Sequence, residues 1–186
     1  MEKKPTEILE EEHHIIQLVV GVMAALAEGL DAGKGPDCSI LRDLVEFMRM
    51  FADKCHHGKE ESHLFPLLEA KGVPVTGCPL GILIHEHQSG RKLVMELAEA
   101  AEACGKGAPE ANERLRASLQ GLVNLYPNHI WKEDYLLFPM TNKILSDEEQ
   151  RELLEKFELV EESIGKGEHH RFVTMAEVLA EQTQRL

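Results

Sequence analysis

The chain has 186 residues, of which 43% are hydrophobic and 5% aromatic, and its formal net charge is −13. This length fits one domain with a core of its own. The acidic charge argues against nucleic acid and against an anionic membrane surface as partners, since both attract clustered Lys and Arg. The start MEKKPTEILEEEHH lacks the apolar segment of a signal peptide, and no apolar run approaches the roughly 20 residues that span a bilayer. We therefore expect a cytoplasmic protein without membrane or nucleic-acid partners.

The composition, rich in Leu, Ala, Glu and Val with few β-branched runs, predicts an all-α protein. Breaking and capping residues divide the chain into six predicted helices, at about residues 6–30, 39–70, 79–103, 109–140, 147–163 and 168–185. Short Gly/Pro connections favour antiparallel neighbours. The first four helices are thus predicted to form an up-down-up-down four-helix bundle of two pseudo-symmetric hairpins. The bundle is expected to occupy residues 1–145, and a C-terminal helical pair, residues 146–186, to pack on one flank.

Several helix ends carry recognisable signals. Thr6 and Ser39 are the predicted N-caps of the first two helices, and Ser146 with Glu149 makes a capping box for the fifth. Pro66 is expected to kink or end the regular part of the second helix near residue 65, because proline lacks an N–H group and clashes with the preceding turn.

The four cysteines show neither CxxC spacing nor the density of a disulfide scaffold. Free thiols in a reducing cytoplasm are therefore the expectation. Cys55 directly precedes His56, and we interpret it as a buried packing residue rather than a metal ligand, because free Cys usually behaves as a small hydrophobe.

A phrase occurs twice in the chain, as HHGKEESHLFP at residues 56–66 and as HIWKEDYLLFP at residues 129–139. Each copy places a His, then a Glu four residues on, then Leu-Phe-Pro. Residues four apart lie one above the other on a helix. Each phrase therefore stacks an imidazole over a carboxylate, and in the second copy His129 and Glu133 lie in the centre of an apolar stripe. A carboxylate is rarely placed on a buried face unless it is paired or bound to metal.

The first copy contains a competing pair, because His57 and Glu61 have the same spacing as His56 and Glu60. Only the latter pair keeps the four-residue step to the Leu of Leu-Phe-Pro, as in the second copy. We therefore assign His56 and Glu60 to the buried face.

The other two bundle helices each contain a Glu-His pair. His13 and His87 lie on the apolar stripes of these helices, whereas His85 lies on a solvent face. His14 has apolar neighbours of its own, so periodicity alone does not exclude it. The inward set is His13, His56, Glu60, His87, His129 and Glu133.

Four imidazoles and two carboxylates are too many ligands for one tetrahedral ion. They suit two metal ions that share bridging carboxylates and keep open positions for a small molecule. Imidazole and carboxylate together suit iron, manganese or zinc, and the absence of thiolate argues against an iron–sulfur cluster.

The Glu-His pairs and the HxxxE phrases with Leu-Phe-Pro resemble the hemerythrin-like, or HHE cation-binding, domains over about residues 6–140. The resemblance implies a four-helix bundle that holds a non-haem di-iron centre. It implies an oxo, hydroxo or water bridge between the irons, bridging carboxylates at Glu60 and Glu133, and terminal ligands at His13, His56, His87 and His129.

The chain departs from the oxygen-carrying members of that family at two points. They have a fifth His one turn from the third-helix ligand, where this chain has Leu83 and Arg91, and an Asp where this chain has Glu133. Both departures argue against a pure oxygen-carrier role, and the missing His leaves a coordination position open.

For the other polar residues near the predicted ligands, the question is whether they face solvent or the site. Glu12 and Glu86 each precede a ligand His, but helical neighbours point roughly 100° apart, so we interpret both as solvated surface carboxylates. Tyr126 is interpreted as a core tyrosine bonded to a carbonyl, with hydrogen bonding to a metal-bound ligand as the alternative. His63 is either a neighbour of the site or exposed, and His169 and His170 are interpreted as exposed, with a lid contact or a peripheral metal site as the alternative.

Three functions fit this site. The first is a di-iron enzyme or protective protein, peroxidase-like, catalase-like or oxidase-like, that acts on peroxide, oxygen or nitric oxide. The second is a non-enzymatic sensor, carrier or store of oxygen or iron. The third, less favoured, is a structural zinc site. Monomer and homodimer both remain open.

Overall fold

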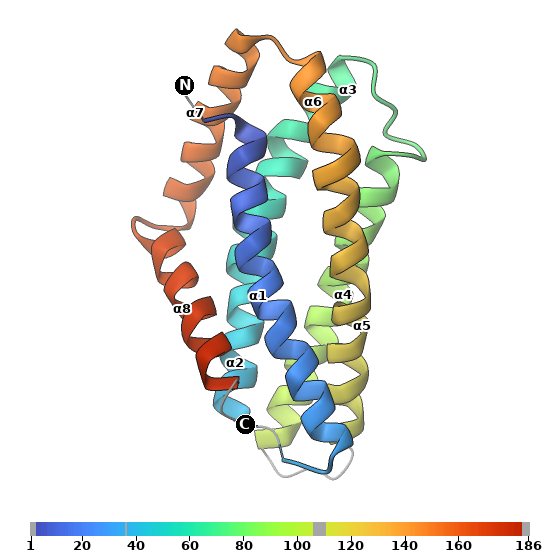
Figure 1. Cartoon of the computed structure of the whole chain (residues 1–186), viewed down its shortest axis with the longest axis vertical. Coiled ribbons are helices and arrows are strands. Elements are labelled where there is room, and N and C mark those ends of the chain that lie inside the picture. Colours follow the sequence, from blue (N-terminus) through green and yellow to red (C-terminus); the bar gives the residue numbers. More distant parts are fainter. Residues whose placement is uncertain (1–2, 36, 106–110, 184–186) are drawn as a thin grey trace.

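The computed structural model describes residues 3–35, 37–105 and 111–183, and every regular element in these ranges is helical (Figure 1). The prediction of an all-α protein is therefore confirmed. The elements are α1 (Pro5–Asp31), α2 (Cys38–Phe47), η1 (Met48–His57), η2 (Glu60–Leu64), α3 (Phe65–Ala70), α4 (Leu80–Gly105), α5 (Ala111–Lys132), η3 (Glu133–Leu137), α6 (Phe138–Ile144), α7 (Asp147–Ile164) and α8 (Glu168–Thr183).

Two of the three predicted helix caps are wrong. Helix α1 begins at Pro5, one residue early, and Lys4 N–H donates to the Glu7 carboxylate at 2.7 Å. Asp37 caps α2 and accepts a hydrogen bond from the backbone N–H of Ser39. Asp and Ser cap helices about equally well, so capping preference alone does not favour Ser39 over Asp37. The capping box at the start of α7 is confirmed.

Some predicted ends cannot be compared with the structure. The predicted start at residue 109 and the predicted end at residue 185 lie outside the described residues. The helix predicted to end near residue 140 continues as α6 to Ile144.

Three segments, η1, η2 and η3, are π-helical. A π-helix bonds residue i to residue i+5, so successive side chains are separated by a smaller angle than the roughly 100° of an α-helix. The regular helix changes type at Phe65, where η2 gives way to α3, close to the point at which Pro66 was expected to end it. Pro66 is the second residue of α3, where the missing N–H is tolerated.

The helices pack lengthwise on one another. Helix α1 lies along α5 and α8, α4 lies along α5, and α2 packs against α4 and α8 (Figure 1). Helices α7 and α8 follow one flank of the molecule and contribute Phe157 and Phe172 to its interior.

The buried apolar side chains form two clusters. One contains residues such as Ile16, Phe47 and Leu122, and the other contains residues such as Leu9, Leu64 and Phe138. In each long helix the predicted ligands lie between residues of the first cluster and residues of the second. The polar site therefore occupies a layer between two apolar layers.

Helix α1 is long and apolar enough, with a mean hydropathy of 1.5 over 18 residues, to meet the length and composition criteria for a membrane span. The expectation that no apolar run approaches the length of a membrane span is therefore wrong by these criteria. The same helix buries Glu12 and His13 inside the protein and packs against α5 and α8. Its apolar character is explained by a core position.

Candidate metal centre

The structure brings all six predicted ligands into one buried layer. Ligand atoms of His13, His56, Glu60 and Glu133 lie within 4.8 Å of one another. His87 and His129 belong to a second group with the same spacing, whose third member is His57. All seven residues are at most 3% exposed.

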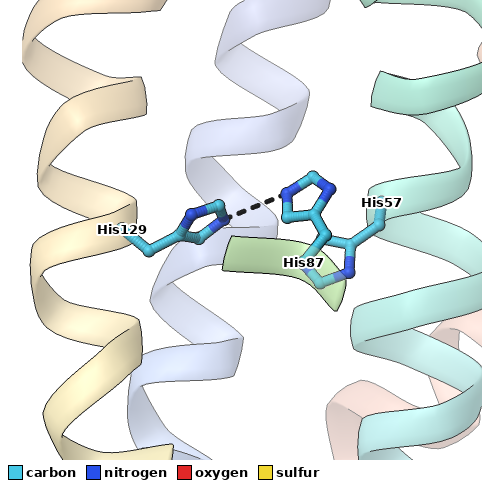
Figure 2. Close-up of side chains that lie close together, drawn as sticks. All are labelled: His57, His87 and His129. Atoms are coloured by element: carbon cyan, nitrogen blue, oxygen red, sulfur yellow. Dashed lines mark hydrogen bonds between the residues drawn. The ribbon is translucent and has the colours of Figure 1, made fainter. Parts of the chain in front are cut away.

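His57 is the member that the sequence analysis left out. Its ring stacks on that of His87, with centroids 3.8 Å apart, and it points toward His129 together with His87 (Figure 2). The choice of His56 over His57 was therefore too narrow, because both face the interior. The angle between the two side chains around the helix axis is smaller in the π-helical segment η1, which ends at His57, than in an α-helix. The one signal for this in the sequence was the second HxxxE pair, which the comparison with the twin phrase set aside.

Glu60 and Glu133 lie between the two histidine groups. Glu133 Oε2 is 3.1 Å from His13 Nε2 and 3.2 Å from His129 Nε2. Glu60 Oε2 is 3.5 Å from His87 Nε2 and 3.8 Å from His56 Nε2. Each carboxylate thus faces both groups, which is the arrangement that a bridging ligand requires.

Seven buried atoms have no hydrogen-bond partner among the residues that the structure describes: the Nε2 atoms of His13, His56 and His57 and both carboxylate oxygens of Glu60 and Glu133. Buried polar groups are normally hydrogen-bonded, and leaving one unsatisfied costs about 1–3 kcal/mol. Here the unsatisfied atoms are all metal-ligand types gathered in one place. The residues present therefore fit a metal centre.

A ring of carboxylates surrounds the histidines. The Nδ1–H groups of the four predicted histidine ligands donate to carboxylates on neighbouring helices, in the pairs His56–Glu12 at 3.0 Å, His87–Glu61 at 2.6 Å, His129–Glu86 at 3.1 Å and His13–Asp134 at 2.6 Å. Such partners fix the tautomer and the ring orientation, so that each Nε2 faces the interior of the layer, where His87 Nε2 and His129 Nε2 lie 3.2 Å apart.

This ring corrects the interpretation of Glu12 and Glu86 as solvated carboxylates. Their side chains are 2% and 17% exposed. Each carboxylate of the ring directly precedes or follows a predicted ligand in the sequence. Because helical neighbours point in different directions, the carboxylate points away from the predicted ligand beside it and reaches a histidine on another helix instead.

The two halves of the centre differ in their outer contacts. Lys59 and Lys132 each lie three residues after a histidine of the repeated phrase, and each binds the carboxylate that holds that histidine. Lys59 is fully buried and also donates to Glu161 of α7 at 2.6 Å, whereas the Lys132 side chain is 29% exposed. The equivalent of His57 in the second phrase is Ile130. Only one half of the repeat therefore supplies an additional imidazole.

His169 of α8 was interpreted as exposed, and this was wrong. It is half-buried, and its Nε2 lies 3.2 Å from Glu12 Oε1. The C-terminal helices therefore reach the carboxylate that orients His56.

Burial sets the protonation of the interior histidines in the metal-free chain. It lowers the pKa of His56 to about 4 and, with the neighbouring His87, lowers the pKa of His57 well below its usual value. Neutral imidazole is the form that binds metal. Against its burial, the hydrogen bond to Asp134 and the nearby Glu133 carboxylate raise the pKa of His13 to about 9. Without a metal, a proton on His13 balances part of the carboxylate charge.

Glu60 and Glu133 differ in the direction in which their pKa values shift. Burial and the Glu133 charge raise the pKa of Glu60 well above its usual value. Two carboxylates in one dry site cannot both ionise cheaply without a cation between them.

The remaining histidines lie outside this layer. His14 is exposed and donates to the Glu10 carbonyl at 2.7 Å, His85 is exposed as predicted, and His170 is exposed. His63 is half-buried, and burial lowers its pKa.

A cavity of about 220 Å³ reaches the layer from one side. Tyr126 lines it together with His57, Gly90, Asp53 and Arg91. The Tyr126 side chain is buried, with its ring 6.5 Å from that of His57. A role for its hydroxyl toward a bound ligand stays a prediction.

Comparison with known proteins agrees with this geometry. The family model described as the hemerythrin HHE cation binding domain matches residues 4–141. Uncharacterised proteins of Mycobacterium tuberculosis and Mycobacterium bovis are 26% identical over 168 residues, which is 89% of this chain and 62% of each relative. The chain thus spans less than two thirds of the length of these relatives. No solved structure matches.

Proposed function

Because the chain belongs to the hemerythrin HHE cation-binding domain family, we propose that it holds two iron ions in the buried layer and binds or reacts with a small oxidant there. Peroxide, oxygen and nitric oxide are the candidate ligands. The observation that carries the proposal is the gathering of seven unsatisfied nitrogen and oxygen atoms at the centre of a closed carboxylate ring. Manganese or zinc would suit the same donors, so the identity of the metal is part of the test.

The residues divide into two unequal sets. His13 and His56 face one metal position, whereas His57, His87 and His129 face the other. Glu60 and Glu133 lie between the positions. The position with two imidazoles has fewer protein donors, so we place the exogenous ligand there. Iron would supply Lewis acidity and electron transfer. The carboxylate ring would hold each imidazole in place, and the apolar layers would exclude water.

His57 favours a second candidate function, reversible oxygen binding. Five imidazoles surround this centre, and the fifth comes from η1 instead of the third bundle helix. The lack of a His at Leu83 and Arg91 therefore no longer argues against an oxygen carrier. Glu133 in place of an aspartate remains a difference.

The first prediction concerns metal content. Full-length protein loaded with ferrous iron without oxygen and then exposed to air should retain two iron ions per chain and show the charge-transfer absorption of ferric iron. Glu133→Ala should lose both ions, because it removes a donor shared by the two positions. His14→Ala, at an exposed histidine, is the matched control and should retain both. Stoichiometry measured by plasma mass spectrometry decides the question, and a wild-type chain without bound metal would refute the proposal.

The second prediction separates the two functions. If the protein acts on peroxide, the iron-loaded chain should consume hydrogen peroxide faster than the metal-free chain. Equal rates would exclude this activity. An absorption change that oxygen induces and that degassing reverses would then establish oxygen binding.

We also propose that the first four helical stretches form an up-down-up-down bundle whose domain ends near residue 145. Contacts of α1 with α5 and of α2 with α4 support this arrangement.

A further inference from the structure

Two cysteines that are far apart in the sequence lie side by side in the fold. Cys38 is the first residue of α2, and Cys104 lies in the last turn of α4. Their Sγ atoms are 3.1 Å apart. Both are free thiols, and a disulfide, at about 2.05 Å, requires only a further approach of about 1 Å.

The two thiols differ in their surroundings. Cys38 is the first residue of its helix, and it lines a broad cavity together with Arg42 and Arg49. Burial and the neighbouring sulfur raise the pKa of Cys104 to about 11, so Cys104 keeps its proton and can donate it to Cys38. Cys38 is therefore the better nucleophile, and solvent reaches it through the cavity.

We propose that Cys38 and Cys104 form a reversible intramolecular disulfide when the protein meets a peroxide. Cys38 reacts as the thiolate, the nucleophilic form of a thiol, and attacks one peroxide oxygen. The O–O bond breaks, and the departing hydroxide takes up the proton that Cys38 released, so the first water leaves as Cys38 becomes a sulfenic acid. The Cys104 sulfur then attacks the Cys38 sulfur, and the hydroxyl leaves as the second water with the Cys104 proton. Two thiols and one hydrogen peroxide thus give one disulfide and two waters, and a dithiol reductant reverses the change.

The disulfide would join the start of α2 to the end of α4, at the end of the molecule opposite α3 and α6 (Figure 1). Cys38 precedes His56 by eighteen helical residues, so the pair lies roughly 20 Å or more from the metal layer. The proposal rests on the two thiols and does not depend on the proposed metal chemistry.

The test uses the full-length chain, treated with a chelator so that metal-catalysed oxidation does not contribute. Equimolar hydrogen peroxide should lower the intact mass by about 2 Da, and the titre of free thiols should fall from four to two. Digestion should yield one linked peptide pair that contains Cys38 and Cys104. The melting temperature should rise by about 5–10 °C and return after reduction.

Cys38→Ser and Cys104→Ser should each abolish the linked pair and the rise in melting temperature. Cys78→Ser, at an exposed cysteine outside the pair, is the matched control and should still form the link. A disulfide between other cysteines, covalent dimers in place of the internal link, or oxidation that stops at oxygenated cysteine would each overturn the proposal.

Discussion

Replacing His57 with isoleucine is expected to remove one of the two metal ions that we propose for the buried layer. The change introduces the residue that the second phrase carries at the equivalent position, Ile130, and it deletes one of the three imidazoles that face the same metal position. Removing a residue that hydrogen-bonds a metal ligand typically lowers the metal affinity by about 10–100-fold. Removing the ligand itself should lower it more. Iron content after dialysis against a competing chelator should fall from two ions per chain to one.

Folding should survive this change. His57 Nε2 is a buried atom without a hydrogen-bond partner among the described residues, so the metal-free variant should melt no lower than the metal-free wild type. His63→Ala, at a half-buried histidine outside the two groups, is the control and should keep both ions. Two retained ions in the His57 variant would mean that His57 only packs against His87.

Replacing Lys59 with methionine is expected to destabilise the metal-free fold by about 3 kcal/mol. Lys59 is fully buried between Glu12 and Glu161, and methionine keeps most of its apolar length while removing the charge. The Glu12 carboxylate, 2% exposed, would then lose its only lysine partner in the described structure and keep histidine partners. Urea unfolding of the metal-free chain, followed by helical circular dichroism, measures the change.

Lys132→Met is the matched control, because Lys132 has the equivalent position in the repeat and binds Glu86. Its side chain is 29% exposed, and ion pairs near the surface contribute about 0–1 kcal/mol. The loss should therefore be several-fold smaller than at Lys59. Equal losses at the two positions would show that burial by α7 and α8 does not strengthen the Lys59 contacts.

The helical class and the inward placement of the six predicted ligands could be predicted from the sequence because both depend on spacing within single helices. A His and a Glu four residues apart share a face whatever the helix packs against. The repeat then identified the buried face of the second helix from that of the fourth, which is why His56 and Glu60 were placed in the interior alongside His129 and Glu133.

The residue that caps a helix could be predicted from the sequence only to within two positions. Asp37 and Ser39 are both good capping residues two positions apart, and local sequence did not decide between them.

Relations between helices were decided only by the tertiary structure. An α-helical period places His57 away from His56, but the π-helical turn of η1 lets both face the layer, and nothing in the spacing of the residues predicted that turn.

Glu12 looked like a surface residue because it cannot reach His13, and its true partner, His56, lies on another helix. Burial of Lys59 likewise depends on α7 and α8, which lie far along the chain. The sequence by itself determined which donor types gather in the core, because that follows from periodicity. Packing determined how many imidazoles serve each position and which carboxylate orients each one, because those contacts join residues that no helical period relates.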